Sequence, residues 1–491
     1  MNLSRSFALL VLGMMGVGAA TAARADIKSQ LYERYLERRL EGLRGADRVF
    51  GGGIFASSPD DQLPVHKVDS YVFDQSVTHA ANDTHTFPQR YYINAEAADG
   101  PNSPVILYIC GEAACTDKQL TKGAILAYAA KLHAVLVTLE HRYYGKSQPH
   151  GTLSAPDLKE LTTTLALQDL ATFQKYATEK HSLRGKWVVV GGSYAGSLSA
   201  YYRQTYPQLV VGSLSSSGPV QARENFEEYD HHVATVAGAA CAAKMREATR
   251  QIEAAIPDAA KFAAIKKEFD ASDVRDATDF LYVVADMGAI AVQYGHKDEL
   301  CDALLAAQAA ELVSEYARVG KDLFKAFGIT ALEDSFQGIE SEDPKTYENN
   351  IGMRSWMWQS CLEYGYFQNA YHDAAVTVRS TRINPAYHAS VCKRFFGLGP
   401  VNVSAVNEKL YQPLLDAAKA TNIFFTNGST DPWSKLGITP ENGNASNPKV
   451  DVFVIQGAAH CDDLHADKPT DSSSLKQART MFSAMLARWL Q

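Results

Sequence analysis

Residues 187–196 read Trp-Val-Val-Val-Gly-Gly-Ser-Tyr-Ala-Gly, and the interpretation of the whole chain starts from this segment. An apolar run leads into a glycine-rich turn, and a helix-forming stretch follows. This order is typical of a nucleophile elbow, where only small residues fit beside a strained serine. Such a turn lifts the Ser193 hydroxyl above a sheet and directs the Tyr194 amide, an oxyanion donor, to the same space. The alternative is a glycine-rich turn with an incidental serine, and Ala195 stands where the general motif has glycine.

A serine nucleophile needs a histidine base and an acid that orients the base. In hydrolases built around such an elbow, the chain order is serine, acid, histidine. Two late β-like runs, 423–426 and 450–455, are followed by Asp431 and His460 in that order. Open α/β sheets place functional groups at the carboxyl ends of their strands. The sequence therefore predicts Ser193, Asp431 and His460 as catalytic residues, with an Asp-Pro turn and a capping histidine as the plain alternatives for the last two.

Two earlier segments are expected at the same edge of the sheet. The loop after the apolar run 105–109 reads Cys-Gly-Glu-Ala-Ala-Cys, and backbone amides near Glu112 and Ala113 are the candidates for the second oxyanion donor. Glu140-His-Arg142 follows the run 134–139. His141 precedes Ser193, contrary to the order expected of the base, so we interpret its segment as a structural network near the site.

The distribution of strand and helix patterns indicates one α/β domain with an insertion. Between about 87 and 214, short apolar runs alternate with helical stretches, which predicts a parallel sheet covered by helices. From about 220 to 400 the sequence is helical in pattern with few strand signals, and the alternation returns near 423. We therefore expect an α/β domain formed by residues 26–220 and 401–491, split by a mostly helical cap at 221–400.

The composition and the amino terminus predict an exported protein. The chain has 491 residues and a net charge of −8, which argues against binding to a nucleic-acid backbone. Residues 1–25 combine a basic start, an apolar run and an Ala-Arg-Ala cleavage pattern, as in a secretory signal peptide. The apolar run has about 14 residues, short of the roughly 20 that span a bilayer. We expect a secreted or periplasmic protein whose mature chain has no membrane span.

The seven cysteines bear on both redox state and metal binding. Export permits disulfides, and an odd number leaves at least one thiol unpaired or paired between molecules. No Cys-x-x-Cys spacing occurs and the histidines do not cluster with cysteines, so no metal site is expected. Cys110 and Cys115 are close enough in sequence to staple the loop between them, which makes their pairing one option.

Six segments match one known family in its order along the chain: TFPQRYYIN (86–94), EHRYYGKS (140–147), GGSYAG (191–196), WQSCLEYGYFQ (358–368), NGSTDPWS (427–434) and GAAH (457–460). Together they resemble the family of lysosomal Pro-X carboxypeptidase, dipeptidyl peptidase II and thymus-specific serine protease. The resemblance implies an α/β-hydrolase fold with a mostly helical cap inserted before the last strands. It implies peptide hydrolysis, commonly after proline, by Ser193, Asp431 and His460. It also implies disulfides between Cys241 and Cys301 and between Cys361 and Cys392.

A pocket for proline must be compact, apolar and flat-walled, and aromatic residues near the predicted site are suited to it. Trp433 is close to the predicted acid, whereas Trp356, Trp358, Tyr364 and Phe367 belong to the cap. Of these we expect Trp433, Trp358 and Tyr364 to contact substrate, with packing inside the cap as the alternative. Glu363, or the Glu112 side chain, would hold a free amino terminus unless the carboxylate is solvated or structural. A carboxypeptidase would need a cation instead, for which Arg142 is the candidate.

The sequence thus predicts an exported serine peptidase that cleaves peptides, commonly after proline, through an acyl-enzyme. We favour an exopeptidase of dipeptidyl- or carboxypeptidase type. An esterase or lipase of the same fold and a non-catalytic binding protein on that fold are the alternatives. The expected partners are peptide substrates, without nucleic acid, cofactor or metal, and a homodimer stays open.

Overall fold

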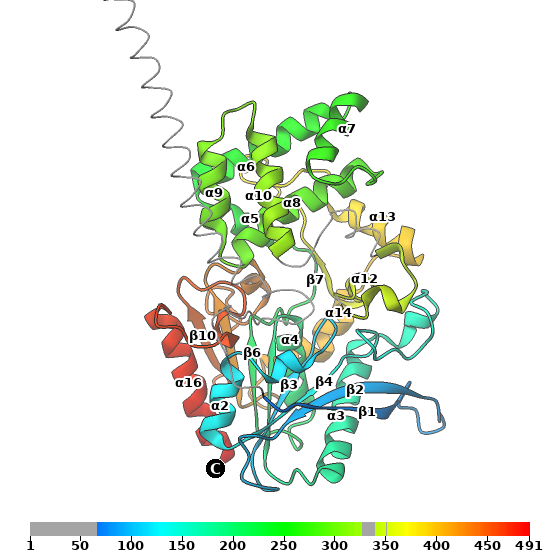
Figure 1. Ribbon diagram of the computed structural model, residues 1–491, viewed down its shortest axis with the longest axis vertical. Helices are drawn as coiled ribbons and strands as arrows, with labels where there is room; N and C mark the ends of the chain where they lie inside the picture. The colour runs from blue at the N-terminus through cyan, green and yellow to red at the C-terminus, as the bar shows by residue number, and fades with distance from the viewer. Residues whose placement is uncertain (1–65, 327–338, 350) are drawn as a thin grey trace, which may run out of the picture.

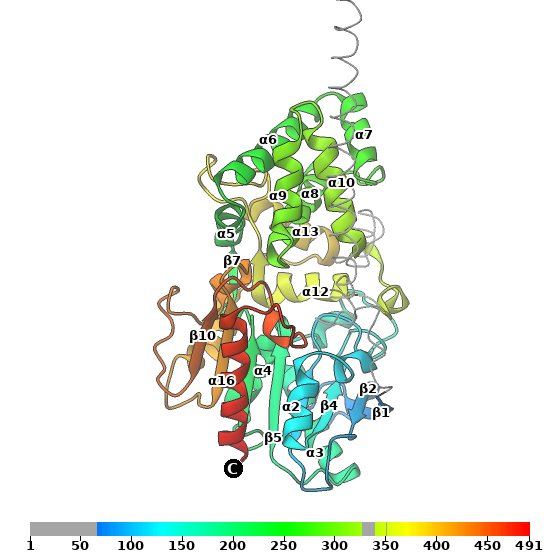
Figure 2. The same cartoon turned by 60° about the vertical axis from the view of Figure 1, so that its left-hand side comes forward.

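The structure is a computed structural model that describes residues 66–326, 339–349 and 351–491 (Figure 1). The predicted signal peptide lies outside the described residues. Within them, no helix has the length and apolar character needed to cross a membrane. The chain forms a sheet flanked by helices and, at one end of that sheet, a group of further helices (Figures 1 and 2).

The sheet carries eight strands, and most of them are parallel. They are β1 (Asp69–Ser76), β2 (Thr86–Asn94), β3 (Val105–Ile109), β4 (Val135–Leu139), β5 (Trp187–Gly192), β6 (Gly212–Ser216), β9 (Ile423–Gly428) and β10 (Asp451–Ile455). Their order across the sheet is β1-β2-β4-β3-β5-β6-β9-β10. β2 pairs antiparallel with β1 and with β4, and every neighbouring pair from β4 to β10 is parallel.

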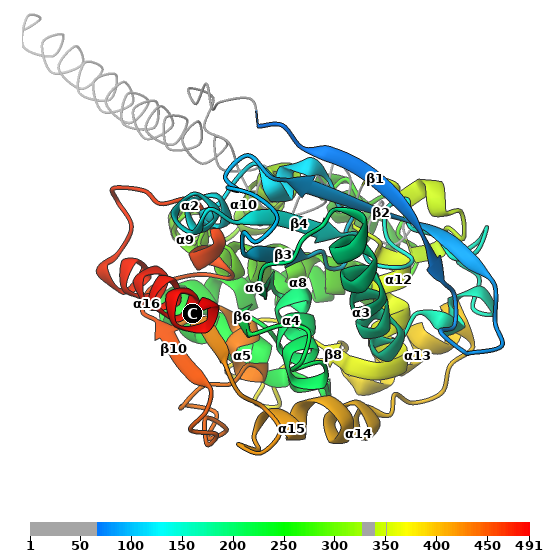
Figure 3. The ribbon, with the colours of Figure 1, turned by 90° about the horizontal axis from the view of Figure 1, so that it is seen from below.

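Helices cover both faces of this sheet, and the central strands are buried on both sides. β3, β4, β5 and β6 are buried at every position. Successive side chains of a strand point to opposite faces. On β3, Ile106 and Tyr108 pack with α2 (Ala124–Leu132) and α16 (Ser473–Leu490), whereas Val105 and Leu107 pack with α3 (Thr163–Lys180) and α4 (Tyr194–Thr205). Figure 3 shows these helices on their two sides, as the sequence predicted.

The chain leaves the sheet after β6 and returns to it at β9, and the segment between is mostly helical. Its main helices are α5 (Glu227–Ala237), α6 (Ala239–Ala255), α7 (Ala259–Glu268), α8 (Ala277–Gln293), α9 (Lys297–Ala306), α10 (Leu312–Ala326), α12 (Met353–Gln359) and α13 (Pro385–Phe396). They lie together at one end of the molecule (Figures 1 and 2). The fold is thus an α/β-hydrolase fold with a helical cap, and we call residues 221–400 the cap.

Some elements differ from the sequence-based expectation. The antiparallel hairpin β1–β2 was not predicted, and neither was the short parallel pair β7 (Arg223–Asn225) and β8 (Gly365–Phe367) inside the cap. The helical stretch between β4 and β5 is also divided, because Asp157–Glu160 forms a separate short turn and α3 starts only at Thr163. The reason is local, because the Thr162 side chain accepts the Leu165 N–H and caps the new helix.

Six of the seven cysteines form disulfides. The structure pairs Cys241 with Cys301 and Cys361 with Cys392, the two pairs that the resemblance implies. It also joins Cys110 to Cys115, which closes the loop after β3. The remaining cysteine, Cys461, is a buried free thiol.

Candidate active site

Ser193 sits on a strained turn between β5 and α4. Its backbone has φ 58° and ψ −132°, in a region that residues with side chains rarely adopt. A Cβ on Gly191 would lie 2.0 Å from the Ala195 carbonyl oxygen, and one on Gly196 would lie 2.7 Å from the Ser216 carbonyl oxygen, so both positions require glycine. The Ser193 N–H donates to the Ser216 carbonyl at 2.9 Å. This geometry is that of a nucleophile elbow, with Ser193 partly exposed.

Asp431 and His460 meet on loops that follow β9 and β10. His460 Nδ1 lies 2.7 Å from Asp431 Oδ2, and both side chains are buried. The second Asp431 oxygen accepts the Trp433 N–H at 2.9 Å, which fixes the carboxylate at the start of the short helix Pro432–Leu436. His460 Nε2 is buried and has no hydrogen-bond partner among the described residues. The imidazole is therefore oriented by the acid on one side and available on the other.

The elbow and the His460 loop share one anchor. The Ser216 carbonyl, which accepts the Ser193 N–H, also lies 3.6 Å from the Cys461 thiol. The Cys461 N–H in turn donates to the Ser217 hydroxyl at 3.0 Å. Because β5 and β6 are neighbours and β6 pairs with β9, the three predicted residues come to one edge of the sheet. This edge holds the carboxyl ends of the parallel strands, as predicted.

The ionisation of His460 is controlled by its neighbours. Burial lowers the pKa of His460, but the charge of Asp431, the adjacent Cys461 and the hydrogen bond that His460 donates to Asp431 together outweigh burial. The pKa of His460 therefore lies well above its ordinary value. The cationic imidazole, which a general base forms when it accepts a proton, is stabilised at this position.

The loop after β3 lies against the elbow on one side and the cap on the other. A Cβ on Gly111 would lie 3.5 Å from Ala195 Cβ, an ordinary contact distance. The Gly352 N–H donates to the Glu112 carbonyl at 3.0 Å, and Ala113 forms a β-bridge with Ile351. Burial raises the pKa of the Glu112 carboxyl, against the opposing influence of its own amide and of His460. The loop that contains Glu112 and Ala113 thus lies against the elbow and is held there by residues of the cap.

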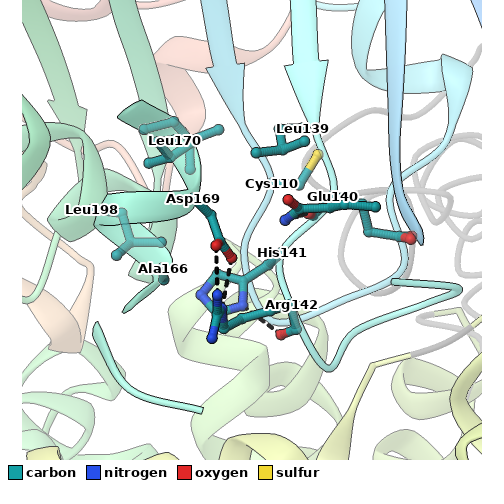
Figure 4. Close-up of a pocket in the computed structure, with 11 residues that line it drawn as sticks. Cys110, Leu139, Glu140, His141, Arg142, Ala166, Asp169, Leu170 and Leu198 are labelled. Atoms are coloured by element: carbon teal, nitrogen blue, oxygen red, sulfur yellow. Dashed lines mark hydrogen bonds and ion pairs between the residues drawn. The ribbon is translucent and has the colours of Figure 1, made fainter. Parts of the chain in front are cut away.

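Glu140, His141 and Arg142 form a buried network under the elbow (Figure 4). Two guanidinium nitrogens of Arg142 bond the two Asp169 oxygens at 2.6 and 2.5 Å. His141 Nε2 lies 3.1 Å from the Tyr194 hydroxyl, and burial lowers the pKa of His141 to about 4. These residues line a small cavity away from His460, which agrees with the interpretation of the segment as structural.

The profile of the serine carboxypeptidase S28 family matches residues 75–482. The chain belongs to this family. Over 380 residues it is 35% identical to the probable serine protease EDA2 of Arabidopsis thaliana, covering 74% of each chain. It is 29% identical to the thymus-specific serine protease of Mus musculus, over 84% of this chain and 85% of the relative.

A third relative connects the chain with proline-directed peptidases by name. The lysosomal Pro-X carboxypeptidase of Bos taurus is 25% identical over 452 residues, which cover 85% of this chain and 87% of the relative. The S28 peptidase described here is therefore a serine-type peptidase and a hydrolase related to Pro-X carboxypeptidase. The recognition made from the six sequence segments is confirmed.

Aromatic side chains of the S28 peptidase gather between the acid loop and the cap. The Trp433 ring centroid lies 5.5 Å from each of those of Phe226, Tyr229 and Tyr366. Tyr364 stacks on Tyr366 at 4.9 Å. Trp356 lies 5.4 Å from Tyr194, the residue after Ser193. Trp433 and Trp356 are partly exposed, whereas the tyrosines are buried, so the two tryptophans form the accessible part of the group.

Two expected substrate-binding residues lie elsewhere. Trp358 is buried against Phe396 in a separate cluster, at 5.4 Å between the rings. Since 3.6 residues make a helical turn, residues two apart in α12 face opposite sides, and Trp356 rather than Trp358 faces the elbow. The Glu363 carboxylate accepts the N–H and the hydroxyl of Thr163 at 2.9 and 2.7 Å. Glu363 thus binds the start of α3, and neither Glu363 nor Trp358 belongs to the aromatic group around Trp433.

Sequence reasoning missed Gln293 and Tyr294, which bring the cap to the catalytic loops. The Gln293 carbonyl accepts the His460 N–H at 2.9 Å, and the Tyr294 ring lies edge-on to His460 at 5.7 Å. The available signal was Gly295, which follows an apolar helical run and marks its end. That signal predicts where a helix stops and carries no information about which distant loop its end contacts.

Proposed function

We propose that this S28 peptidase hydrolyses peptides through an acyl-enzyme on Ser193, with His460 as general base and Asp431 as the orienting acid. The observation that carries the proposal is the buried His460–Asp431 pair at 2.7 Å, which leaves Nε2 unpartnered among the described residues. His460 Nε2 takes the Ser193 hydroxyl proton as the oxygen attacks the scissile carbonyl. His460 then gives the proton to the leaving amine, and water releases the acyl group by the reverse route.

The negative charge on the tetrahedral intermediate needs hydrogen-bond donors. We assign the Tyr194 N–H, at the first position of α4, and an amide of Glu112 or Ala113. The start of a helix is suited to this role because its first N–H groups have no partner inside the helix. The contact between Gly111 and Ala195 supports the assignment of the second donor to the β3 loop. Each such donor contributes about 10² to 10³ in rate.

The aromatic group supports a preference for proline before the scissile bond. Trp433 lies two residues beyond Asp431, and Trp356 and Tyr366 lie on the cap side. Flat rings at these positions suit a rigid pyrrolidine ring, which buries its apolar surface at a low entropy cost. We therefore assign Trp433 and Tyr364 as part of the substrate-binding group and add Trp356 in place of Trp358.

Among the exopeptidase types, the contacts favour recognition of the amino end. Arg142, the candidate for a substrate carboxylate, is fully buried and bonded to Asp169. Glu363 is occupied by Thr163. The Glu112 side chain, on the loop beside the elbow, is the remaining candidate from the sequence to bind a substrate ammonium group. We accordingly favour the release of dipeptides over the release of single carboxy-terminal residues.

We also propose that the protein is exported, as residues 1–25 predict. Three disulfides support an oxidising location. Mass spectrometry of the protein purified from its producing cells tests the proposal. A mature chain that begins at Asp26 is the expected result, and a chain that retains residues 1–25 would contradict it.

The experiment that tests the activity is digestion of a peptide library by the wild-type protein and by Ser193→Ala, read by mass spectrometry. We expect dipeptides ending in proline from the wild type and no cleavage by the variant. Fluorophosphonate labelling should modify the wild type only. Hydrolysis of short-chain esters without peptide cleavage would instead indicate an esterase. A wild-type protein that takes up no label would indicate a binding protein.

A further inference from the structure

The end of α8 leaves a backbone carbonyl pointing away from the helix. The last residues read Ala291-Val-Gln-Tyr-Gly-His296. Gly295 has φ +79°, the His296 N–H donates to the Ala291 carbonyl at 2.7 Å, and the Gly295 N–H donates to the Val292 carbonyl at 3.2 Å. This is a Schellman ending, which turns the chain sharply. The Gln293 carbonyl has no partner inside the helix and is free to accept a distant donor.

Gln293 uses both its backbone and its side chain to hold the catalytic loops. Its carbonyl accepts the His460 N–H at 2.9 Å. Its side-chain oxygen, Oε1, accepts the Trp433 indole N–H at 2.9 Å and the Tyr229 hydroxyl at 2.7 Å. An amide oxygen has two lone pairs, so both acceptor positions are used. The residue is 6% exposed, and water cannot easily replace these bonds.

The orientation of Trp433 is set by this bond as well as by packing. The ring is partly exposed, and its contacts with Phe226, Tyr229 and Tyr366 lie on the buried side. The indole N–H is the single polar atom of the ring, and losing its acceptor would leave a donor unpaired in an apolar site. The backbone N–H of Trp433 is held by Asp431. Gln293 therefore sets the angle of the ring, while Asp431 sets the position of its backbone.

We propose that Gln293 is a positioning residue that determines the specificity of this S28 peptidase: its side chain orients the Trp433 wall of the substrate pocket, and its carbonyl holds the His460 loop. The inference rests on the proposed function, because it assigns Trp433 to the proline pocket. It makes the cap part of the active site, since one helix end couples substrate choice to the position of the base. The edge-on contact between Tyr294 and His460 extends the same coupling.

The decisive variant is Gln293→Met, which keeps the length of the side chain and the backbone carbonyl but removes Oε1. The substrates are two peptides that differ only in having proline or alanine before the scissile bond. We expect the ratio of kcat/KM values, proline over alanine, to fall about tenfold, mainly through KM for the proline peptide. A fluorophosphonate should still label Ser193 in this variant, because the His460 N–H keeps its backbone acceptor, and this labelling shows that the variant is folded.

A matched control removes a hydrogen bond from another face of the same helix. The Tyr316 hydroxyl donates to the Val284 carbonyl of α8 at 3.1 Å, inside the cap. Tyr316→Phe should leave the ratio of kcat/KM values, proline over alanine, unchanged even if the variant is less stable than the wild type. Trp433→Phe removes the other end of the Gln293 bond, and the double variant should lose no more specificity than either single variant.

The outcomes separate this inference from the proposed function. A wild-type protein without any proline preference refutes the proline pocket, and the inference falls with it. A wild type that prefers proline, together with a Gln293→Met variant of unchanged ratio, overturns the inference alone. If Gln293→Met does not fold, Trp433→Phe is the deciding variant. An unchanged ratio of kcat/KM, proline over alanine, in Trp433→Phe also overturns the inference.

Discussion

His460 shows how much of the site is decided by a few contacts of one residue. Its Nδ1 is bonded to Asp431, its backbone N–H to Gln293, and its ring lies against Tyr294. The first contact sets the tautomer, because an Nδ1–H donated to the carboxylate leaves Nε2 as the acceptor. The other two fix the ring in space. The chemistry of the base therefore comes from the acid, and its placement comes from the cap.

Replacing the acid tests the first of these contacts. We expect Asp431→Asn to lower kcat by about 10⁴-fold, since an amide can favour the wrong imidazole tautomer without changing the shape of the site. Steady-state kinetics on the best peptide from the library measure the effect. The control is Asp462→Asn, which retains an acceptor for the Ala459 N–H and should change kcat by less than about threefold. Equal effects of the two variants would contradict the assignment of Asp431.

The pKa of His460 predicts the pH dependence of the reaction. The base works in its neutral form, and the folded-state pKa of His460 lies well above the ordinary value. The kcat/KM of the wild type should therefore still be rising with pH above about 6.5, the ordinary pKa of histidine. The contribution of His460 to stability has the opposite course: it is complete below about 6.5 and is lost as pH rises through the folded-state pKa.

Measurements of kcat/KM and of urea unfolding over a pH series test the two predictions, the first for activity and the second for stability. In Asp431→Asn the charge that does most to raise the pKa of His460 is gone, so the remaining activity should reach its plateau at lower pH than in the wild type. A wild-type plateau that is already complete below about pH 6 would contradict this account of His460.

Two helix ends illustrate the same motif in two different settings. α8 ends before Gly295 at φ +79°, and α13 ends at Gly397 with φ +69°. Both glycines allow the chain to turn in the left-handed region, where residues with a Cβ are strained. A Cβ at Gly295 would lie 3.5 Å from Ala459 Cβ, next to His460, whereas a Cβ at Gly397 would meet nothing within 4 Å. One ending serves the active site and the other only terminates a helix.

This pair provides a matched test at the level of the element. Gly295→Ala and Gly397→Ala should each lower the free energy of unfolding by about 1 kcal/mol, because each places a Cβ in the left-handed region. Gly295→Ala alone should also lower kcat/KM, since it disturbs the turn that holds the His460 loop. Urea unfolding and steady-state kinetics give the two readouts. A Gly295→Ala variant with unchanged kinetics would show that this helix end does not position the loop.

At the scale of the molecule, the site belongs to two parts of the chain. The sheet supplies the elbow and the loops of Asp431 and His460, and the cap supplies Gln293 and Trp356. The cap also supplies Gly352, which bonds the loop after β3. Figure 2 shows the cap helices at the end of the sheet where these loops lie. Activity therefore depends on the stability of the cap as well as on that of the sheet.

The disulfides of the cap test how much the cap contributes to the stability of the molecule. Cys241–Cys301 joins α6 to α9 across 60 residues, and Cys361–Cys392 closes a loop of 31. Loop entropy predicts that replacing the first pair by alanines costs about 4 kcal/mol of unfolding free energy, and replacing the second costs about 0.6 kcal/mol less. Urea unfolding of the two double variants measures this order. An unfolding midpoint of the Cys241→Ala/Cys301→Ala variant equal to that of the wild type would contradict this prediction.

Local patterns were sufficient to predict much of the fold and to nominate the three residues that we propose as catalytic. The elbow is a local strand–turn–helix, and the apolar runs of β3, β4 and β5 identify buried parallel strands. Asp431 and His460 were found because each follows a strand, and strand ends meet at a common edge. In these cases the signal lies within about ten residues of the group it identifies.

The pocket and its supports were decided by packing between distant segments. Nothing in the local sequence distinguishes Trp356 from Trp358, and the choice depends on which side of α12 meets Tyr194. The sequence does not show that the Glu363 carboxylate is already bonded, because its partner Thr163 lies 200 residues away and comes beside it only in the folded chain. Gln293 reads as an ordinary helix residue, and its role arises from bonds to partners more than 60 residues away along the chain. A sequence specifies periodicity and turns over short spans, whereas such contacts exist only once the sheet and the cap have packed together.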